Sequence, residues 1–157
     1  MTILNELNQY LINAKKSLGV KNIFLIESSN GYVMSAVADN KDFDVESLGS
    51  LSSGSITAME TLFALFHSSK LETQLIESND EKFFFVRVRE NYFLLITADA
   101  ETKLGFLKLK AEKIIPEIAD FIERFTIENK IEVSEIDIDD ISCQLDSEFD
   151  KLFIGKK

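Results

Sequence analysis

The chain of 157 residues contains few of the residues that build covalent cross-links and metal sites. It has one cysteine, one histidine, one proline and no tryptophan. The single thiol, Cys143, excludes a disulfide within the chain and is typical of a protein from a reducing compartment. The lone histidine, His67, has no second histidine or nearby cysteine with which to share a metal ion. We therefore expect no metal centre and interpret His67 as a helix-end or interface residue.

The sequence also lacks long apolar runs and an excess of positive charge. No apolar run approaches the ~20 residues that span a bilayer. The first residues, 1–6, lack the basic start of a secretory signal peptide. The formal net charge of −10 repels phosphate backbones and disfavours adsorption to anionic lipid. We expect a cytoplasmic protein that neither binds nucleic acid nor inserts into a membrane.

Motifs for nucleotide binding, hydrolysis and calcium binding are missing as well. The chain has no Gly-x-x-x-x-Gly-Lys-Ser/Thr loop, so it is not itself a P-loop GTPase. Residues 49–54 read Gly-Ser-Leu-Ser-Ser-Gly, which lacks the spacing of a hydrolase nucleophile turn. The acidic residues between 128 and 140 lack the spacing and the glycine of a calcium loop. We therefore expect no catalytic residue and no cofactor, and we interpret the acidic segment as solvated.

Helix and strand patterns fill most of the chain. Hydrophobic residues make up 45% of it, enough for one ordinary domain with a buried core. Asn30-Gly31 follows an apolar run and is the strongest short hairpin signal, because both residues tolerate positive φ. The patterns predict helices over 2–17 and 44–68, strands over 22–27, 32–37, 73–77, 82–88 and 92–97, and a last helix that begins near Thr102.

The last helical pattern contains the only proline, Pro116. Proline removes a backbone donor and clashes with the preceding turn, so we expect a kink or a break there. In the second case, Pro116 opens a new helix that ends near Ile127. We interpret 1–127 as the domain and 128–157 as an acidic C-terminal extension. Four apolar residues of this extension suit a short amphipathic helix: Leu145, Phe149, Leu152 and Phe153.

The helix expected at 44–68 has two distinct faces. Gly49 and Gly54 each weaken it by roughly 1 kcal/mol relative to alanine. Close approach of another backbone is the simplest compensation. One face is mainly apolar and consists of Leu48, Leu51, Ser55, Met59, Leu62 and Phe66. The second face is made of small residues: Ser50, Ser53, Gly54, Thr57, Thr61, Ala64 and Ser68.

Several short motifs occur along the chain in a fixed order. They are Gly19-Val20, Ile23-Phe24-Leu25-Ile26, Asn30-Gly31, Val33-Met34-Ser35-Ala36, Phe93-Leu94-Leu95-Ile96 with Asp99, and Leu104-Gly105-Phe106-Leu107-Lys108-Leu109. Together with the order of helices and strands, this set resembles the roadblock / dynein light-chain domain family over about residues 3–127. The chain departs from the family pattern at Lys103 and Lys108, where asparagine and arginine are frequent, and also at Pro116 and in the C-terminal extension.

The resemblance implies an α+β fold of the order α-β-β-α-β-β-β-α. The five strands form an antiparallel sheet, with the second helix on one face and the other two helices on the opposite face. It also implies a homodimer in which the 73–77 strands pair and the second helices pack antiparallel. Such pairing would bring a close neighbour to the small-residue face and would give hydrogen-bond partners to the short edge strand. The expected interface residues are Ser50, Ser53, Gly54, Thr57, Thr61, Ala64, Thr73, Leu75 and Glu77.

The resemblance also implies a partner. Members of the family bind Ras-like small GTPases as scaffolds, activators or localisation factors, and bacterial gliding-motility polarity regulators are the nearest analogy. The expected partner contacts are Met59, Phe63, His67, Leu145 and Phe149, the last two in an extension that could touch the GTPase. The first hypothesis is therefore a homodimeric, non-catalytic regulator that binds such a GTPase.

Other functions remain open at this point. The same dimer could serve as a nucleotide-independent structural scaffold of a larger complex, or a pocket between sheet and helices could bind a small molecule. A GTPase activator sometimes supplies an arginine to the transition state. Arg87 and Arg89 alternate with valines on a strand, however, so we expect them to pair with acids on one face of the sheet.

Overall fold

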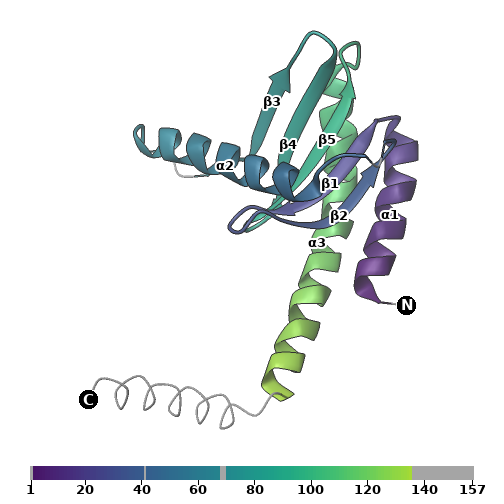
Figure 1. The fold of residues 1–157 in the computed structure, drawn as a ribbon, viewed down its shortest axis with the longest axis vertical. Helices are drawn as coiled ribbons and strands as arrows, with labels where there is room; N and C mark the ends of the chain where they lie inside the picture. The colour runs from purple at the N-terminus through teal and green to yellow at the C-terminus, as the bar shows by residue number, and fades with distance from the viewer. Residues whose placement is uncertain (1, 41, 68–69, 136–157) are drawn as a thin grey trace. The chain divides into compact units, whose positions relative to one another are not determined.

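The computed structural model describes residues 2–40, 42–67 and 70–135 and divides the chain into two compact units after Ile122. Figure 1 shows an open five-stranded sheet with helices on both faces in the first unit. The helix α3 begins in this unit and continues into the second. In chain order the elements are α1 (Ile3–Leu18), β1 (Asn22–Glu27), β2 (Tyr32–Ala38), α2 (Val45–Ala64), β3 (Thr73–Glu77), β4 (Glu81–Arg89), β5 (Tyr92–Asp99) and α3 (Leu104–Glu135).

The sheet is antiparallel throughout and follows the order β2-β1-β5-β4-β3. The central strands β1 and β5 are nearly continuous apolar runs, because both of their faces are covered. The strands β2 and β3 form the two edges. The turn between β1 and β2 uses Gly31 with φ 74°, and the turn between β4 and β5 uses Glu90 with φ 46°. The predicted antiparallel sheet and the hairpin at Asn30-Gly31 are confirmed.

Two hydrophobic cores lie on opposite faces of the sheet. The first is formed against α1 and the first part of α3 by Leu7, Leu11, Ala14, Leu18, Val20, Ile23, Leu25, Phe84, Val86, Leu94, Ile96, Ala98, Leu107, Ala111, Ile118 and Ile122. The second is formed against α2 by Phe24, Ile26, Ile56, Leu71, Phe85, Phe93 and Leu95. The helix α2 therefore covers one face while α1 and α3 cover the other, as Figure 1 shows and as the resemblance predicts.

The ends of α1 are set by local hydrogen bonds. The Thr2 hydroxyl accepts from the backbone N–H of Asn5 at 3.2 Å and caps the start of the helix. Gly19 adopts φ 68° at the C-terminal end, and its N–H donates to the carbonyl oxygens of Lys15 and Lys16. The predicted first helix is confirmed, and it fixes which residues face the sheet.

Two predicted helix boundaries are wrong. The second helix ends at Ala64 rather than at 68, because the N–H groups of Leu65 and Phe66 bond three residues back in tighter turns. The last helix does not end near Ile127 but continues to Glu135. Residues 128–135 include glutamate, lysine and isoleucine but no glycine or proline, so nothing local stops the helix before Glu135.

The predicted break at Pro116 is also wrong, because Pro116 lies inside the continuous α3. Pro116 is exposed to solvent. The carbonyl oxygen that would accept from its missing N–H is therefore not left buried without a hydrogen-bond partner. Ala111 on one side and Ile118 on the other are fully buried in the same core. Packing therefore holds the turns on both sides of Pro116, as far as Ile122, against one face of the sheet. Within the described ranges, no helix is both long and apolar enough to cross a membrane.

Candidate protein-interaction surface

The start of α2 is fixed by Asp44. Its carboxylate accepts from the backbone N–H of Ser47 at 3.1 Å and from the Ser47 hydroxyl at 2.5 Å. These bonds, the hydroxyl first, hold the pKa of the Asp44 carboxyl below its usual value. The cap fixes the residue at which α2 begins, and the packing of the helix on the sheet decides which of its residues point away from it.

The inner side of α2 is a narrow strip. Gly49, Ser52 and Ile56 are buried there, and Met59 and Phe63 continue the strip as half-buried residues that pack on the second core. These five positions follow helical spacing, three and four residues apart. The remaining face of α2 is free of the sheet.

The outer side of α2 exposes large apolar side chains. Leu51 and Leu65 are each 74% exposed, and Leu62 is 46% exposed. Gly54 lies one turn after Leu51 and has no heavy atom within 4 Å of the position that its Cβ would occupy. Exposed leucines around an open glycine are unusual on a surface that remains in water. A second helix could approach this face closely.

The residues predicted for a dimer interface lie mostly on this outer side. Of the predicted interface residues on α2, only Ser53 points partly toward the sheet. Its hydroxyl donates a hydrogen bond to the carbonyl oxygen of Ser28. On β3, Leu75 is half-buried and packs on the opposite core. The exposed members of the predicted set are Ser50, Gly54, Thr57, Thr61, Ala64, Thr73 and Glu77.

The residues predicted for partner contact are more scattered. Met59 and Phe63 pack mainly against the core beneath α2. His67 is exposed just beyond the helix and has a left-handed backbone with φ 63°. Leu145 and Phe149 lie outside the described residues. Of the predicted partner contacts, the structure therefore describes only Met59, Phe63 and His67, and the first two are turned mainly toward the core.

Sequence reasoning missed the significance of Leu51, Leu62 and Leu65. It grouped Leu51 and Leu62 with Leu48 and Met59 on one apolar face, although the structure splits that face between core and solvent. The inner strip instead follows a repeat of five residues: Gly49, Ser52, Ile56, Met59 and Phe63. Two of these residues are small or polar, so hydrophobicity alone could not identify it.

The free edge of the sheet at β3 carries features that suit pairing with another strand. Among the residues that the structure describes, β3 pairs only with β4, so its outer backbone groups face away from the sheet. Ile76 is 41% exposed and lies opposite Phe83, which packs on the core beneath α2. Ile76 is therefore on the same side of the sheet as α2. The side-chain oxygen of Gln74, two residues earlier, is buried without a hydrogen-bond partner among the described residues.

Arg87 is committed to the interior of the fold. Its side chain is 9% exposed, and its Nη2 donates to Glu60 of α2 at 2.7 Å. Its Nε donates to the carbonyl oxygen of Leu71 at 2.9 Å, and its guanidinium lies 4.6 Å from the ring centre of Phe93. The predicted pairing with an acid is confirmed for Arg87. This arginine thus ties β4 to α2 and cannot reach a partner's active site without breaking these contacts.

A polar recess of about 420 Å³ opens beside α2. Glu60 supplies its carboxylate, and its other polar groups come from α2 and from the turns at one end of the sheet. They are Ser28, Ser29, Thr57, Thr61 and Asn91. The recess is open to solvent and includes predicted interface residues, so it suits a side chain of a docked protein better than an enclosed small molecule.

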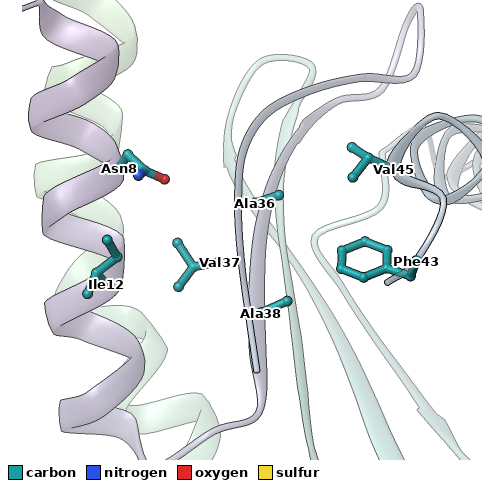
Figure 2. A pocket seen from close by; sticks show the side chains of 7 residues that line it. All are labelled: Asn8, Ile12, Ala36, Val37, Ala38, Phe43 and Val45. Atoms are coloured by element: carbon teal, nitrogen blue, oxygen red, sulfur yellow. The ribbon is translucent and has the colours of Figure 1, made fainter. Parts of the chain in front are cut away.

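A second hollow, of about 510 Å³, lies at the other edge of the sheet, along β2. Figure 2 shows Asn8 and Ile12 of α1 on one side of the strand, with Phe43 and Val45 on the other. Ala36, Val37 and Ala38 of β2 also line it, and among the described residues Asn8 is its one polar side chain. A single amide gives little to orient a small molecule. The small-molecule hypothesis therefore gains no support from this hollow.

Within residues 2–40, 42–67 and 70–135, no group of three or more histidine, cysteine, aspartate or glutamate side chains could hold a metal ion. The candidate surfaces for contact with another protein are the apolar outer side of α2, the polar recess and the β3 edge.

No protein-family model matches the sequence, and no curated protein matches it significantly. Solved structures do match. MglB from Myxococcus xanthus has a TM-score of 0.71 and 25% identity, over 77% of this chain and 90% of that chain. The gliding protein MglB from Thermus thermophilus has a TM-score of 0.66 and 18% identity, over 78% and 90%. A Roadblock/LC7 domain from Streptomyces avermitilis has a TM-score of 0.60 and 14% identity, over 66% and 86%.

These similarities confirm the resemblance to the roadblock family that the sequence motifs predicted. The chain has the roadblock-like fold seen in those structures and is similar to MglB.

Proposed function

We propose that this protein is a homodimeric regulator that binds a Ras-like small GTPase and has no active site of its own. The single observation that carries the proposal is the exposed apolar outer side of α2, with Leu51 and Leu65 each 74% exposed. The likeness of the chain to MglB, together with the roadblock motifs, supports a small GTPase as the class of partner. Dimerisation creates the surface on which the GTPase would dock.

In the proposed dimer, two β3 edges pair antiparallel about a two-fold axis perpendicular to the sheet. This axis keeps both α2 helices on one face of the combined sheet, where their outer sides meet. Gly54 allows close approach, and Leu51, Leu62 and Leu65 lose exposed apolar area. Ile76 lies on the same face as α2 and would be covered at the same time. Pairing would also give the buried oxygen of Gln74 access to a donor from the second copy.

The GTPase would dock on the face that carries the two α2 helices. The polar recess beside each α2 offers hydroxyl, amide and carboxylate groups at its rim. Such groups can form hydrogen bonds that orient the docked GTPase. Since Arg87 is bound to Glu60 and Leu71, any effect on GTP hydrolysis would come from positioning the GTPase's own residues.

The test is affinity capture from native lysate with the full chain, read by mass spectrometry. One sample contains a non-hydrolysable GTP analogue and the other contains GDP. We expect a small GTPase chiefly in the first sample. The variant Thr57→Arg/Thr61→Arg should lose it, whereas Gln9→Arg/Asn13→Arg, a matched pair of exposed positions on α1, should retain it. Absence of any GTPase from both samples would reject the proposed partner.

The alternative is a nucleotide-independent scaffold that uses the same dimer. The exposed apolar side of α2 supports it equally well. In the same experiment a scaffold would recover the same proteins with the GTP analogue and with GDP. Light scattering of the purified chain tests the dimer itself, independently of either partner.

A further inference from the structure

Positive charge gathers at one end of the α1–α3 layer, although the whole chain carries a net charge of −10. Residues 103–113 contain four lysines and one glutamate. Lys110 Nζ donates to the carbonyl oxygen of Ser17 at 3.1 Å, which places this stretch of α3 beside the last turn of α1 and its Lys16. Lys110 and Lys113 also line a hollow of about 240 Å³ between the two helices. The charge is therefore clustered in space.

Most of these lysines are available for an external partner. Lys15 pairs with Asp39, and Lys21 pairs with Glu81 and Asp99. The structure gives no carboxylate partner, among the residues it describes, to the other exposed lysines of this end of the layer. They are Lys16, Lys103, Lys108 and Lys113.

Large apolar side chains stand among these lysines. Phe106 is 51% exposed and Leu109 is 57% exposed, three residues apart on one face of α3. Leu104, at the first position of the helix, is 37% exposed. Lys110 Nζ lies 4.5 Å from the ring centre of Phe106. We name this set the lysine–aromatic face: Leu104, Phe106, Leu109, Lys103, Lys108, Lys110 and Lys113.

We propose that the lysine–aromatic face attaches the protein peripherally to an anionic lipid bilayer. Phe106 and Leu109 enter the headgroup region while the lysines contact lipid phosphates, with their own alkyl stems lying against the apolar side chains. The net negative charge of the chain does not prevent this contact. Charges more than about 8 Å from the surface are largely screened at physiological ionic strength.

A bilayer fits better than an acidic protein segment because of the geometry of the proposed homodimer, on which this argument rests. Pairing of the β3 edges about an axis perpendicular to the sheet keeps the α1–α3 layers of both copies on one side. Two lysine–aromatic faces then point the same way, and an extended surface can engage both at once. The α2 helices lie on the opposite side of the sheet and stay free for the GTPase.

The test is co-sedimentation of the full chain with vesicles. One set contains phosphatidylcholine alone, and the other contains phosphatidylcholine and phosphatidylglycerol in equal parts. We expect at least about tenfold stronger binding to the anionic vesicles, weakened by added salt. Equal binding to both vesicle types, or no binding to either, overturns the proposal.

Variants locate the contact. Lys108→Glu/Lys113→Glu and Phe106→Ser/Leu109→Ser should each reduce anionic-vesicle binding about tenfold. The charge-matched control Lys70→Glu/Lys130→Glu alters two other exposed lysines and should bind nearly as the parent protein does. Equal losses in the control and in Lys108→Glu/Lys113→Glu would show that only overall charge matters. Unfolding midpoints in urea verify that each variant is folded.

Two further measurements test this proposal separately from the proposed function. Lys108→Glu/Lys113→Glu should stay dimeric by light scattering and still capture the GTPase, because α2 is untouched. Gly54→Leu should be monomeric and bind anionic vesicles more weakly than the dimer, because one attachment is lost. A monomeric variant that binds vesicles as tightly as the dimer overturns the bivalent attachment, whereas a monomeric parent protein overturns the proposed dimer.

Discussion

Gly49 of α2 lies directly against the carbonyl oxygen of Gly31 in the turn between β1 and β2, and a Cβ at Gly49 would overlap that oxygen. In the other direction, a Cβ at Gly31 would lie 3.0 Å from the carbonyl oxygen of Gly49, at a φ of 74° that favours glycine. The two backbones thus meet without side chains between them. This contact seats α2 on the sheet, while Gly54, five residues later, faces open space.

The two glycines of α2 should respond oppositely to alanine. Gly49→Ala forces α2 away from the turn and should lower the free energy of unfolding by about 2–4 kcal/mol. Gly54→Ala adds a methyl group where no atom lies within 4 Å and should raise it by up to about 1 kcal/mol, because alanine is the better helix former. Urea unfolding of both variants measures the difference. A similar loss in both would mean that helix propensity, not contact with Gly31, governs Gly49.

A bulky residue at Gly54 should act on association. Gly54→Leu leaves the protomer folded, since the position is open, but should separate the two α2 helices and dissociate the proposed dimer. Light scattering across a concentration series measures the change in mass. Ser29→Leu, at an exposed position in the turn after β1, serves as a control of similar size. A Gly54→Leu protein that remains dimeric would remove the argument for a close helix crossing.

Arg87 should be important for stability. Arg87→Met removes the partner of Glu60 and leaves the carbonyl oxygen of Leu71 without its donor, so we expect a loss of about 2–4 kcal/mol in the free energy of unfolding. Arg89→Met is the matched control, since Arg89 is 34% exposed and pairs with Glu90 at 3.6 Å. Its loss should be about 1 kcal/mol or less. Equal losses in the two variants would contradict the structural role assigned to Arg87.

The stability should fall at high pH through Tyr10. Burial, followed by the neighbouring Glu117 carboxylate, raises the pKa of Tyr10 to about 12. In the unfolded chain the value is about 10. Between these values the unfolded state loses the proton while the folded state keeps it, so this contribution is present below pH 10 and disappears as the pH rises to about 12.

Ultraviolet titration of tyrosinate measures this directly. One of the three tyrosines should ionise near pH 12 in the parent protein, and this step should be absent from Tyr10→Phe. The decline in the free energy of unfolding above pH 10 should be shallower in the variant. Titration of all three tyrosines near pH 10 would show that Tyr10 is not perturbed.

Much of the fold could be read from local sequence. Asn30-Gly31 and the apolar runs on either side of it predicted the first hairpin, and the spacing of Leu7, Leu11 and Leu18 predicted α1 and its buried face. Local rules failed at Pro116, where burial of Ala111 and Ile118 outweighs the lost hydrogen bond. They also failed after Ile127, where no local signal marks an end.

The candidate surface was only partly predictable. The sequence identified a helix with small residues on one side, and five of the six predicted interface positions on α2 are exposed: Ser50, Gly54, Thr57, Thr61 and Ala64. The sequence could not distinguish Gly49 from Gly54, because each glycine weakens the helix by the same amount relative to alanine. It placed Leu51 and Leu62 with residues that pack on the core, since hydrophobicity does not record which face meets the sheet.

By itself, the sequence determined the order of helices and strands, the turns, and the family that they resemble, because these depend on periodicity and on residues with special backbone preferences. The tertiary structure decided the rotation of α2, through the contact between Gly49 and Gly31. It thereby decided which leucines remain in water. It also gathered the lysines of α1 and α3 at one end of the layer, although the chain as a whole is acidic. Contacts between residues distant in sequence set both features, and no local pattern records them.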